Sequence, residues 1–499
     1  MKKVKMISVF CMALALLFYS VPGNVIFSKE AKSTVTEGNA FTLTAKDDFK
    51  NGNVENLVVG KEKGGQVSLA KDDGKYASKG SFTSKAIYTE PFSNLIASWD
   101  SQTPEGTSIN VEAQVLVDGE WSSWITWGTW GTNQENSSVD DSDDFKLAGI
   151  WTDTLYVKND KTANAFKLRV TLNSDDSKTT PVLRAVNATI DLGYGANRIY
   201  PSNEDKDKIE NVDKQLDVPA FSQMIRDPQI KSRICSPTSC TCVVDYYLNK
   251  HNKDNVLPEE SAYTVYDKVY DGFGNWAFSA SYIGSFGLDG KVEFCDSLYD
   301  LKREIYKGNP VVISVNHARS ENDTDPEDAK YPLLHGFPIL ATNGHLITVT
   351  GFTKKDGKEY VCVNDSAAAS DAEAKRMYLA DEFDKAWATS GRVAYTVSDS
   401  EEKVYNPIKR LKASFDEMSS ADNKDSIEYS LIYKGQIVDL SSANAKVIMV
   451  SKDGGAYEYI TPGTNKNLSF SADKESGKYK FLIIAKAGKE YTGSIKIKE

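Results

Sequence analysis

Short runs of alternating apolar and polar residues fill the sequence from about residue 36 to residue 195. SINVEAQVLV, FKLRVTL and PVLRAVNATIDL are typical runs, and polar turns with Gly, Asn and Asp separate them. A period of two places every second side chain on the same face of a strand, so each run can bury one face and expose the other. The pattern predicts an N-terminal all-β domain, a sandwich or jelly roll of two packed sheets.

The sequence changes character between about residues 214 and 400. SPTSCTCVVDYYLNK has apolar residues at helical spacing, and SLYDLKREIYKGNP offers Ser297 as an N-cap and Gly308 as the end of a helix. Strand-like runs then follow in PVVISV, GHLITVTGF and EYVCVND. Helices first and hairpin-connected strands later predict an α+β domain.

The tail of the chain returns to strand-like alternation. Residues 426–499 contain several short alternating runs, and their number and length predict a small Ig-like β-sandwich. The polar stretches 200–213 and 401–425 show no periodicity and are predicted to be linkers. Because 499 residues exceed what one core can hold, we expect a multidomain chain with domains at 36–195, 214–400 and 426–499, the middle one folding on its own.

The N-terminus is predicted to direct export. MKKVKMISVFCMALALLFYSVPG combines three lysines with a short apolar run from Met6 to Tyr19. That run is shorter than the roughly 18–20 residues that a membrane-spanning helix needs. We therefore expect a secretory signal peptide over about residues 1–31, with an uncleaved anchor as the alternative. The mature chain is expected to be secreted or associated with the cell surface, with no membrane span.

The charge of the chain limits its partners. The net charge is −11, and no block of Lys and Arg reverses the balance locally. An acidic protein is repelled by nucleic acids and by anionic membranes. We therefore expect no nucleic-acid partner.

Three cysteines fall within eight residues, at positions 235, 240 and 242. Their C-x4-C-x-C spacing fits none of the usual zinc pairs, so neither a metal nor another cofactor is expected. A thiol reacts as the thiolate, which a helix N-terminus stabilises, and Pro237 is compatible with the first turn of a helix. Cys235 is therefore the predicted nucleophile. Cys240 and Cys242 would lie deeper in the same helix and are predicted to pack in the core.

A cysteine nucleophile needs a base and a group that orients the base. His345 begins the strand GHLITVTGF, and the strand EYVCVND follows after KKDGK. If Asp356-Gly357 forms the hairpin turn, Asp365 lies within diagonal reach of His345. Asn364 competes for the orienting role, but in a regular strand its side chain points to the opposite face. The predicted pair is therefore His345 and Asp365.

Hydrogen-bond donors for an oxyanion are the last element of such a site. The backbone N–H of Cys235 can supply one donor. The side-chain amide of Gln223, in VPAFSQM upstream of the nucleophile, can supply a second. We therefore expect Gln223 to complete the site.

Six segments occur in an order that resembles a known family: VPAFSQ, CSPTSC, GNWAFSASYIGSFGL, GNPVVISV, GHLITVTGF and VNDS. They resemble the double-glycine leader peptidases, papain-like cysteine peptidases of the bacteriocin-processing type, over roughly residues 214–398. The resemblance implies a papain-like fold with Cys235 as nucleophile, His345 as base, Asp365 as its orienting group and Gln223 at the oxyanion. Leader peptidases are fused to a membrane transporter, which this sequence lacks, so the resemblance is to a free-standing secreted branch whose substrates it does not imply.

Other functions fit the same residues. A Cys–His pair serves all acyl transfer, so a cell-wall (peptidoglycan) amidase or endopeptidase is an alternative to a peptidase acting on peptides or proteins. A catalytically inactive surface or glycan-binding protein is a further alternative. In GEWSSWITWGTWG, four tryptophans stand three residues apart, which suits stacking on glycans or packing in a core and implies a bulge or turn. The four are Trp121, Trp124, Trp127 and Trp130.

Two further segments contain candidate residues. Residues 316–345 form a long connection that is predicted to lie over the site, and it carries His317 and His335. Either could in principle replace His345, but only His345 has the hairpin partner. The acidic run VDDSDDF at residues 139–145 has the composition of a calcium loop, although we expect an ordinary acidic surface turn.

Overall fold

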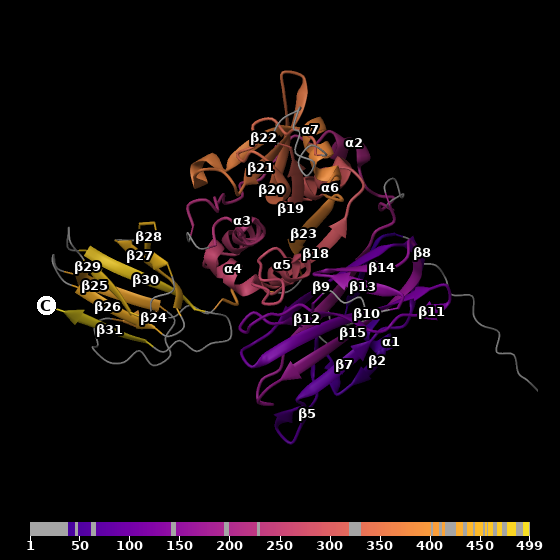
Figure 1. Ribbon diagram of the computed structural model, residues 1–499, viewed down its shortest axis with the longest axis horizontal. Coiled ribbons are helices and arrows are strands. Elements are labelled where there is room, and N and C mark those ends of the chain that lie inside the picture. The colour runs from indigo at the N-terminus through magenta and orange to yellow at the C-terminus, as the bar shows by residue number, and fades with distance from the viewer. Residues whose placement is uncertain are drawn as a thin grey trace, which may run out of the picture. The chain divides into compact units, whose positions relative to one another are not determined.

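The computed structural model describes residues 38–44, 48–60, 66–140, 146–193, 199–226, 230–318, 331–400 and 403–408, and beyond them mainly strands within 412–498 (Figure 1). The predicted signal peptide, most of the acidic run at 139–145 and the middle of the 316–345 connection lie outside these residues. No helix in the described ranges is long and apolar enough to cross a membrane.

The N-terminal domain consists of two antiparallel sheets of seven strands each. The first has the order β13-β14-β9-β16-β4-β3, with β1 on β16, and the second has the order β11-β10-β15-β7-β2, with β12 on β10 and β8 on β15. A short helix, α1 (Asp48–Asn51), and a small hairpin of β5 (Lys71–Asp72) and β6 (Lys75–Tyr76) complete it. The strands of the first sheet are β1 (Ala40–Thr44), β3 (Leu57–Val59), β4 (Val67–Leu69), β9 (Asn94–Gln102), β13 (Ala148–Trp151), β14 (Thr154–Val157) and β16 (Val182–Ile190). Those of the second are β2 (Asn53–Glu55), β7 (Lys79–Thr83), β8 (Ile87–Phe92), β10 (Thr107–Val117), β11 (Glu120–Trp121), β12 (Ile125–Trp130) and β15 (Ala163–Ser174).

The alternation in the sequence explains these strands. Along β10, buried and half-buried residues alternate without a break, and Ile109, Val111 and Val115 are fully buried. β10 pairs with β15 from Thr107 opposite Ser174 onward, so the apolar side chains of both strands face the same core. The prediction of an N-terminal β domain is confirmed, while its jelly-roll form stays a prediction.

The central domain is α+β. An antiparallel sheet in the order β18-β23-β19-β20-β21-β22, with β17 on β20, carries the helices. The helices are α2 (Lys206–Glu210), α3 (Cys235–Lys250), α4 (Pro258–Val265), α5 (Trp276–Gly284), α6 (Leu298–Lys307) and α7 (Ala380–Ala388), with a 3-10 turn at Asp371–Glu373. The strands are β17 (Lys214–Gln215), β18 (Leu288–Phe294), β19 (Val311–His317), β20 (Thr342–Lys355), β21 (Lys358–Asp365), β22 (Lys375–Leu379) and β23 (Val393–Asp399).

The two faces of this sheet belong to two different cores. Neighbouring residues on β19, such as Val312 and Ile313, pack into separate hydrophobic clusters, as a strand period of two requires. Residues of α3, α4 and α5 pack in the first cluster, and residues of α6 and α7 pack in the second. In Figure 1, α3, α4 and α5 accordingly lie together, apart from α6 and α7.

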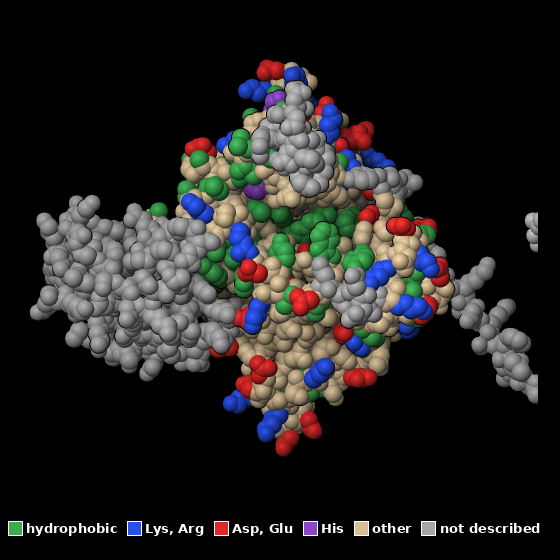
Figure 2. All heavy atoms as spheres, viewed as in Figure 1, with side chains coloured by type: hydrophobic (Ala, Val, Ile, Leu, Met, Phe, Trp, Pro, Cys, Tyr) green, Lys and Arg blue, Asp and Glu red, His purple; other side chains and the backbone are tan. Residues whose placement is uncertain are grey.

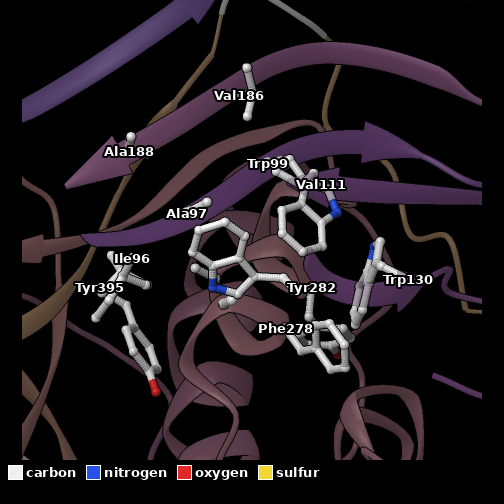
Figure 3. Packing of buried hydrophobic residues seen from close by; sticks show 14 of the residues in the cluster. Ile96, Ala97, Trp99, Val111, Trp130, Val186, Ala188, Phe278, Tyr282 and Tyr395 are labelled. Carbon is white, nitrogen blue, oxygen red and sulfur yellow. The ribbon is translucent and has the colours of Figure 1, made fainter. Parts of the chain in front are cut away.

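The core of the N-terminal domain continues into the central domain (Figure 3). Trp99 of β9 and Trp130 of β12 pack on Phe278 of α5, with ring centroids 6.3 Å and 5.4 Å apart. Tyr282 of α5 and Tyr395 of β23 belong to the same buried cluster. One face of the central sheet therefore shares its core with the N-terminal domain, while the cluster on the other face lies within the central domain. That residues 214–400 fold alone stays a prediction.

Buried polar contacts also join the two domains. Arg184 of β16 donates from Nη2 to the carbonyl oxygens of Gly284 (2.8 Å) and Leu288 (2.6 Å). Asp100 of β9 accepts a hydrogen bond from the backbone N–H of Gly290 at 3.0 Å. These contacts fix the first sheet of the N-terminal domain against the end of α5 and the start of β18.

The stretch predicted as the first linker is packed rather than free. It contains α2, whose N-cap Asp205 accepts a hydrogen bond from the N–H of Lys208. Just before it, Tyr200 donates from its hydroxyl to Asp300 at 3.0 Å and packs its ring against Tyr299. Polar composition predicted a linker, but these side chains use their polar groups to bind α6.

The C-terminal strands form two further sheets. A five-stranded sheet has the order β24-β25-β30-β27-β28, and a three-stranded sheet has the order β29-β26-β31. All pairs are antiparallel except β24 with β25. The strands are β24 (Lys412–Ser414), β25 (Ser426–Ile432), β26 (Ile437–Ser442), β27 (Ala445–Lys452), β28 (Glu458–Pro462), β29 (Asn467–Ser471), β30 (Gly477–Ala485) and β31 (Gly493–Lys498). The strand content agrees with a β domain, while the Ig-like arrangement stays a prediction.

The surface mixes charges of both signs. Figure 2 shows Lys and Arg interspersed with Asp and Glu over the face in view, and hydrophobic side chains gathered in a hollow near its centre. On this face, no large area of one sign stands out.

Candidate active site

Cys235 is the first residue of α3. The preceding Ile234 makes no side-chain cap, so the N–H groups of the first turn remain available at the sulfur end of the helix. Pro237 stands in this first turn, where its missing N–H costs nothing. The helix begins where the sequence predicted, and its positive end faces the thiol.

His345 and Asp365 come from the two strands of one hairpin. Asp356 and Gly357 adopt positive φ angles of 51° and 72° and connect β20 to β21 directly, as a two-residue turn requires. The register pairs Ile347 with Asp365, so His345 stands diagonally from Asp365, as the hairpin predicted. The Nε2 atom of His345 lies 2.9 Å from Oδ1 of Asp365.

Polar contacts hold α3 against β20. The hydroxyl of Ser239 donates to the carbonyl of Leu346 at 2.9 Å, and the hydroxyl of Thr348 donates to the carbonyl of Ser239 at 3.1 Å. Leu346 directly follows His345, and Ser239 is one turn after Cys235. These two bonds therefore fix the helix end that carries the thiol beside the strand that carries the imidazole.

Cys235 and His345 shift each other's protonation. Burial raises the pKa of the Cys235 thiol, but the hydrogen bond and charge of His345 lower it more, and the net pKa lies below the ordinary 9.0. Burial lowers the pKa of His345, but Asp365 and Cys235 outweigh burial and raise this pKa well above 6.5. Both shifts favour the charged forms, a thiolate on Cys235 and an imidazolium on His345. Because Nε2 faces Asp365, Nδ1 is the nitrogen left for Cys235.

Asp365 is fully buried and has a partner for each carboxylate oxygen. Oδ1 accepts from His345 and from the N–H of Ala367 (2.9 Å), and Oδ2 accepts from the hydroxyl of Tyr378 (2.7 Å). Burial raises the pKa of Asp365, but His345, Tyr378 and Ala367 together lower it below 3.8. The carboxylate is thus held ionised behind the imidazolium. The sequence analysis missed Tyr378, whose only signal was its place in a strand near the hairpin.

Gln223 is buried next to the same hairpin. Its backbone N–H donates to the carbonyl of Ser366 at 2.7 Å, and the Ser366 hydroxyl donates to its Oε1 at 3.1 Å. Its Nε2 donates to the carbonyl of Lys231 at 2.7 Å, which occupies one of the two amide hydrogens. Asn364 lies on the other face of β21 and donates to the carbonyl of Pro219 at 2.9 Å, so it anchors the segment that leads to Gln223.

The other three histidines have other polar partners, although the ring of Phe337 packs between His317 and His345. His317 accepts a hydrogen bond at Nδ1 from the N–H of Leu334 (2.9 Å), and its pKa is lowered, mainly by burial. His335 lies 2.9 Å from the carboxylate of Glu382. His251, at the end of α3, lies 2.6 Å from Asp399. Of the four, only His345 interacts with Cys235.

The neighbouring cysteines behave differently from Cys235. Cys235, Cys240, Cys242 and Cys362 are free thiols. Cys240 and Cys242 are buried, and burial raises the pKa of both thiols, that of Cys242 to about 12. They are neutral packing residues at pH 7. Among the described residues, no group of three His, Cys, Asp or Glu side chains could hold a metal ion.

Family comparisons match two parts of the chain. Residues 35–190 match the family model "Peptidase C39 N-terminal domain", and residues 215–395 match the "Peptidase_C39 like family". No curated protein matches the chain.

Solved structures give weaker similarities. A putative C39-like peptidase from Bacillus anthracis is 16% identical, with 38% of this chain and 100% of that chain covered and a TM-score of 0.28. TmCBM61 in complex with β-1,4-galactotriose is 9% identical, with 30% of this chain and 88% of that chain covered and a TM-score of 0.16. The agarase AgWH50C is 10% identical, with 43% of this chain and 32% of that chain covered and a TM-score of 0.17. Such TM-scores do not establish a shared fold. The family matches, by contrast, show similarity of residues 35–190 to a peptidase C39 N-terminal domain and of residues 215–395 to the C39-like peptidase family.

Proposed function

We propose that the protein is a secreted cysteine peptidase that hydrolyses peptide bonds with Cys235, His345 and Asp365. The observation that carries the proposal is the buried His345, bonded to Asp365 on one side and to a Cys235 thiol of lowered pKa on the other. The C39-like family match of residues 215–395 supports the cysteine peptidase class.

The chemistry follows from this pair. The Cys235 thiolate attacks the substrate carbonyl carbon, and the carbonyl oxygen takes up the electron pair as an oxyanion. When the C–N bond breaks, the imidazolium of His345 gives its proton to the leaving amine, and a thioester remains. Neutral His345 then accepts a proton from a water molecule that attacks the thioester. The acid product leaves, and the thiolate and imidazolium are restored.

The oxyanion is assigned two donors in this proposal. The backbone N–H of Cys235 stands at the start of α3, where it has no partner within the helix. Gln223 keeps a second amide hydrogen besides the one bonded to Lys231, and we assign it to the oxyanion. Gln223→Ala should therefore lower kcat by about 100-fold, as removal of a single oxyanion donor does elsewhere.

The remaining functional assignments are part of the proposal. Secretion rests on the N-terminal sequence, and the papain-like, leader-peptidase-like character rests on the ordered segments. Glycan or cell-wall binding by the N-terminal domain rests on Trp121 and Trp124, because Trp127 and Trp130 are buried. Even these two have partners, since Lys167 lies 4.1 Å over the ring of Trp121 and Arg169 lies 4.3 Å over that of Trp124.

The test compares two cysteine variants of the full chain. Cys235→Ala should lose all hydrolysis of a diverse peptide mixture read by mass spectrometry, because the nucleophile is gone. Cys240→Ala, which removes a buried neutral thiol on the same helix, should retain it. Full activity in Cys235→Ala would overturn the proposal. Release of peptides from purified peptidoglycan, with no cleavage of free peptides, would favour the cell-wall alternative instead.

A further inference from the structure

One loop joins α4 to α5 and lies against the segment that precedes the nucleophile. Arg233, two residues before Cys235, lies 3.7 Å from the carboxylate of Asp271 in this loop, and its guanidinium lies 5.7 Å from the ring of Phe273. The hydroxyl of Tyr266 also donates to Asp271 at 2.7 Å. Residues 266–275, called here the α4–α5 loop, therefore border the thiol end of α3.

Tyr270 is the prominent side chain of the α4–α5 loop. Its ring covers Gly272 so closely that a Cβ atom there would lie 2.3 Å from the ring. The residue is nevertheless 49% exposed, and its neighbour Val269 is 39% exposed. Tyr270 directly precedes Asp271, whose carboxylate lies 3.7 Å from Arg233, two residues before Cys235. Burial raises the pKa of the Tyr270 phenol, and the charges of Asp153 and Cys235 raise it further. A fixed, half-exposed aromatic ring beside a nucleophile is suited to contact a substrate.

The N-terminal domain holds both ends of this loop. At its start, Asn136 donates from Nδ2 to the carbonyl of Thr264 (2.7 Å) and accepts from the N–H of Lys268 (3.0 Å). Asp267 accepts from the N–H of Ser138 at 2.9 Å. All three bonds join the two domains, and those of the Asn136 amide and the Asp267 carboxylate are buried.

The end of the loop is held by one carboxylate. Asp153, in the turn between β13 and β14, accepts the N–H of Trp276 at 2.6 Å, and Trp276 is the first residue of α5. Trp127 donates from its indole N–H to the carbonyl of Asp153 at 2.7 Å, which fixes the turn. Burial raises the pKa of Asp153 to about 6, while the Trp276 N–H and Thr154 lower it. A residue of the N-terminal domain therefore caps the helix that follows the α4–α5 loop.

We propose that the α4–α5 loop forms one wall of the substrate cleft, that Tyr270 contacts the substrate there, and that Asp153 is a positioning residue that holds this wall. The proposal rests on the peptidase function proposed above. It makes the N-terminal domain part of the substrate site, in addition to any role in binding glycans.

The test measures alkylation of Cys235 in the full chain by two reagents. Iodoacetamide is small and reports the thiolate alone, whereas a peptidyl chloromethyl ketone must also occupy the substrate cleft. Tyr270→Ala and Asp153→Ala should each lower the rate with the peptidyl reagent by about tenfold, the effect of one lost contact, and leave the iodoacetamide rate within about twofold. Asp153→Asn keeps an acceptor oxygen for Trp276 and should recover most of the peptidyl rate.

Glu112→Gln is the matched control, because Glu112 is a carboxylate of the N-terminal domain that pairs with Arg169 inside the second sheet. It should change neither rate. Equal losses with both reagents, or no loss with the peptidyl reagent, would overturn the proposed wall. Failure of the peptidase function itself would appear in the unaltered protein, as an absence of peptide cleavage with Cys235 still alkylated, and would be separate from any result in the variants.

Discussion

Asp100 offers the most quantitative test of how the first two domains are joined. It lies on β9 and is 2% exposed, with Oδ1 accepting the N–H of Gly290 in β18. Burial raises its pKa from 3.8 to about 7, and the charge of Asp289 adds to the rise, whereas Arg184 opposes it. Burying the ionised carboxyl group at the junction between the domains therefore lowers the free energy of unfolding.

The cost can be worked out from the shift. A rise from 3.8 to about 7 is about 3 pKa units, which at about 1.4 kcal/mol per unit is about 4 kcal/mol. Because the folded state has the higher pKa, it binds more protons than the unfolded state between about pH 4 and pH 7. The stability due to neutral Asp100 is thus fully present below about pH 4 and is lost as the pH rises through 7.

Asp100→Asn removes the charge and keeps an oxygen for the N–H of Gly290. We expect the variant to be more stable than the parent at pH 8, by up to about 4 kcal/mol, and about equally stable at pH 4. Urea unfolding followed by tryptophan fluorescence at both pH values measures this, because Trp99 and Trp130 lie in the shared core.

Two results would refute the reasoning. A variant less stable than the parent at pH 8 would mean that the attraction between Asp100 and Arg184 exceeds the cost of burial. Equal stability at pH 8 would mean that the carboxylate is hydrated, for which the cavity of about 460 Å³ that Asp100 helps to line is the available space.

Two further predictions concern the candidate active site. His345→Ala should abolish peptide hydrolysis and lower the rate at which iodoacetamide alkylates Cys235 at pH 6 by at least about tenfold, because the thiolate loses its cation. His317→Ala should keep both the hydrolysis and the alkylation rate. The reverse result would identify His317 as the base. Tyr378→Phe should lower the free energy of unfolding by about 1–3 kcal/mol, since a buried oxygen of Asp365 loses its donor. Urea unfolding measures this, and unchanged stability would show that the hydroxyl is not needed there.

The hairpin was predictable because its geometry is local. Two residues with a strong turn preference, Asp356 and Gly357, set the register between β20 and β21, and the register sets the distance from His345 to Asp365. The register shift between Val349 and Gly351 was not predictable from the turn, and the pair depends on it. In the uninterrupted register Thr348 would face Asp365, and the side chains of His345 and Asp365 would point to opposite faces of the sheet. The start of α3 was predictable for a similar reason, since helix ends depend on nearby residues.

Long-range contacts at the site were not predictable. Tyr378 reaches Asp365 only because β22 pairs with β21. The sequence of a short strand does not indicate which residue its tyrosine will contact. The sequence suggested that the amide of Gln223 serves an oxyanion, but not that this amide also binds the carbonyl of Lys231. Such bonds depend on how loops close, which one sequence does not reveal.

The contact between the first two domains was not foreseen for a different reason. A buried aromatic residue has the same appearance in the sequence whether it packs within its own domain or against another. Trp130 was weighed as a core residue or a glycan ligand, and its contact with Phe278 across the junction was not considered. The charged stretch at 200–213 then suggested independent domains. Linker composition, however, predicts independence only where the facing surfaces are polar, and here both are apolar, so hydrophobic burial rather than the linker decides how the domains associate.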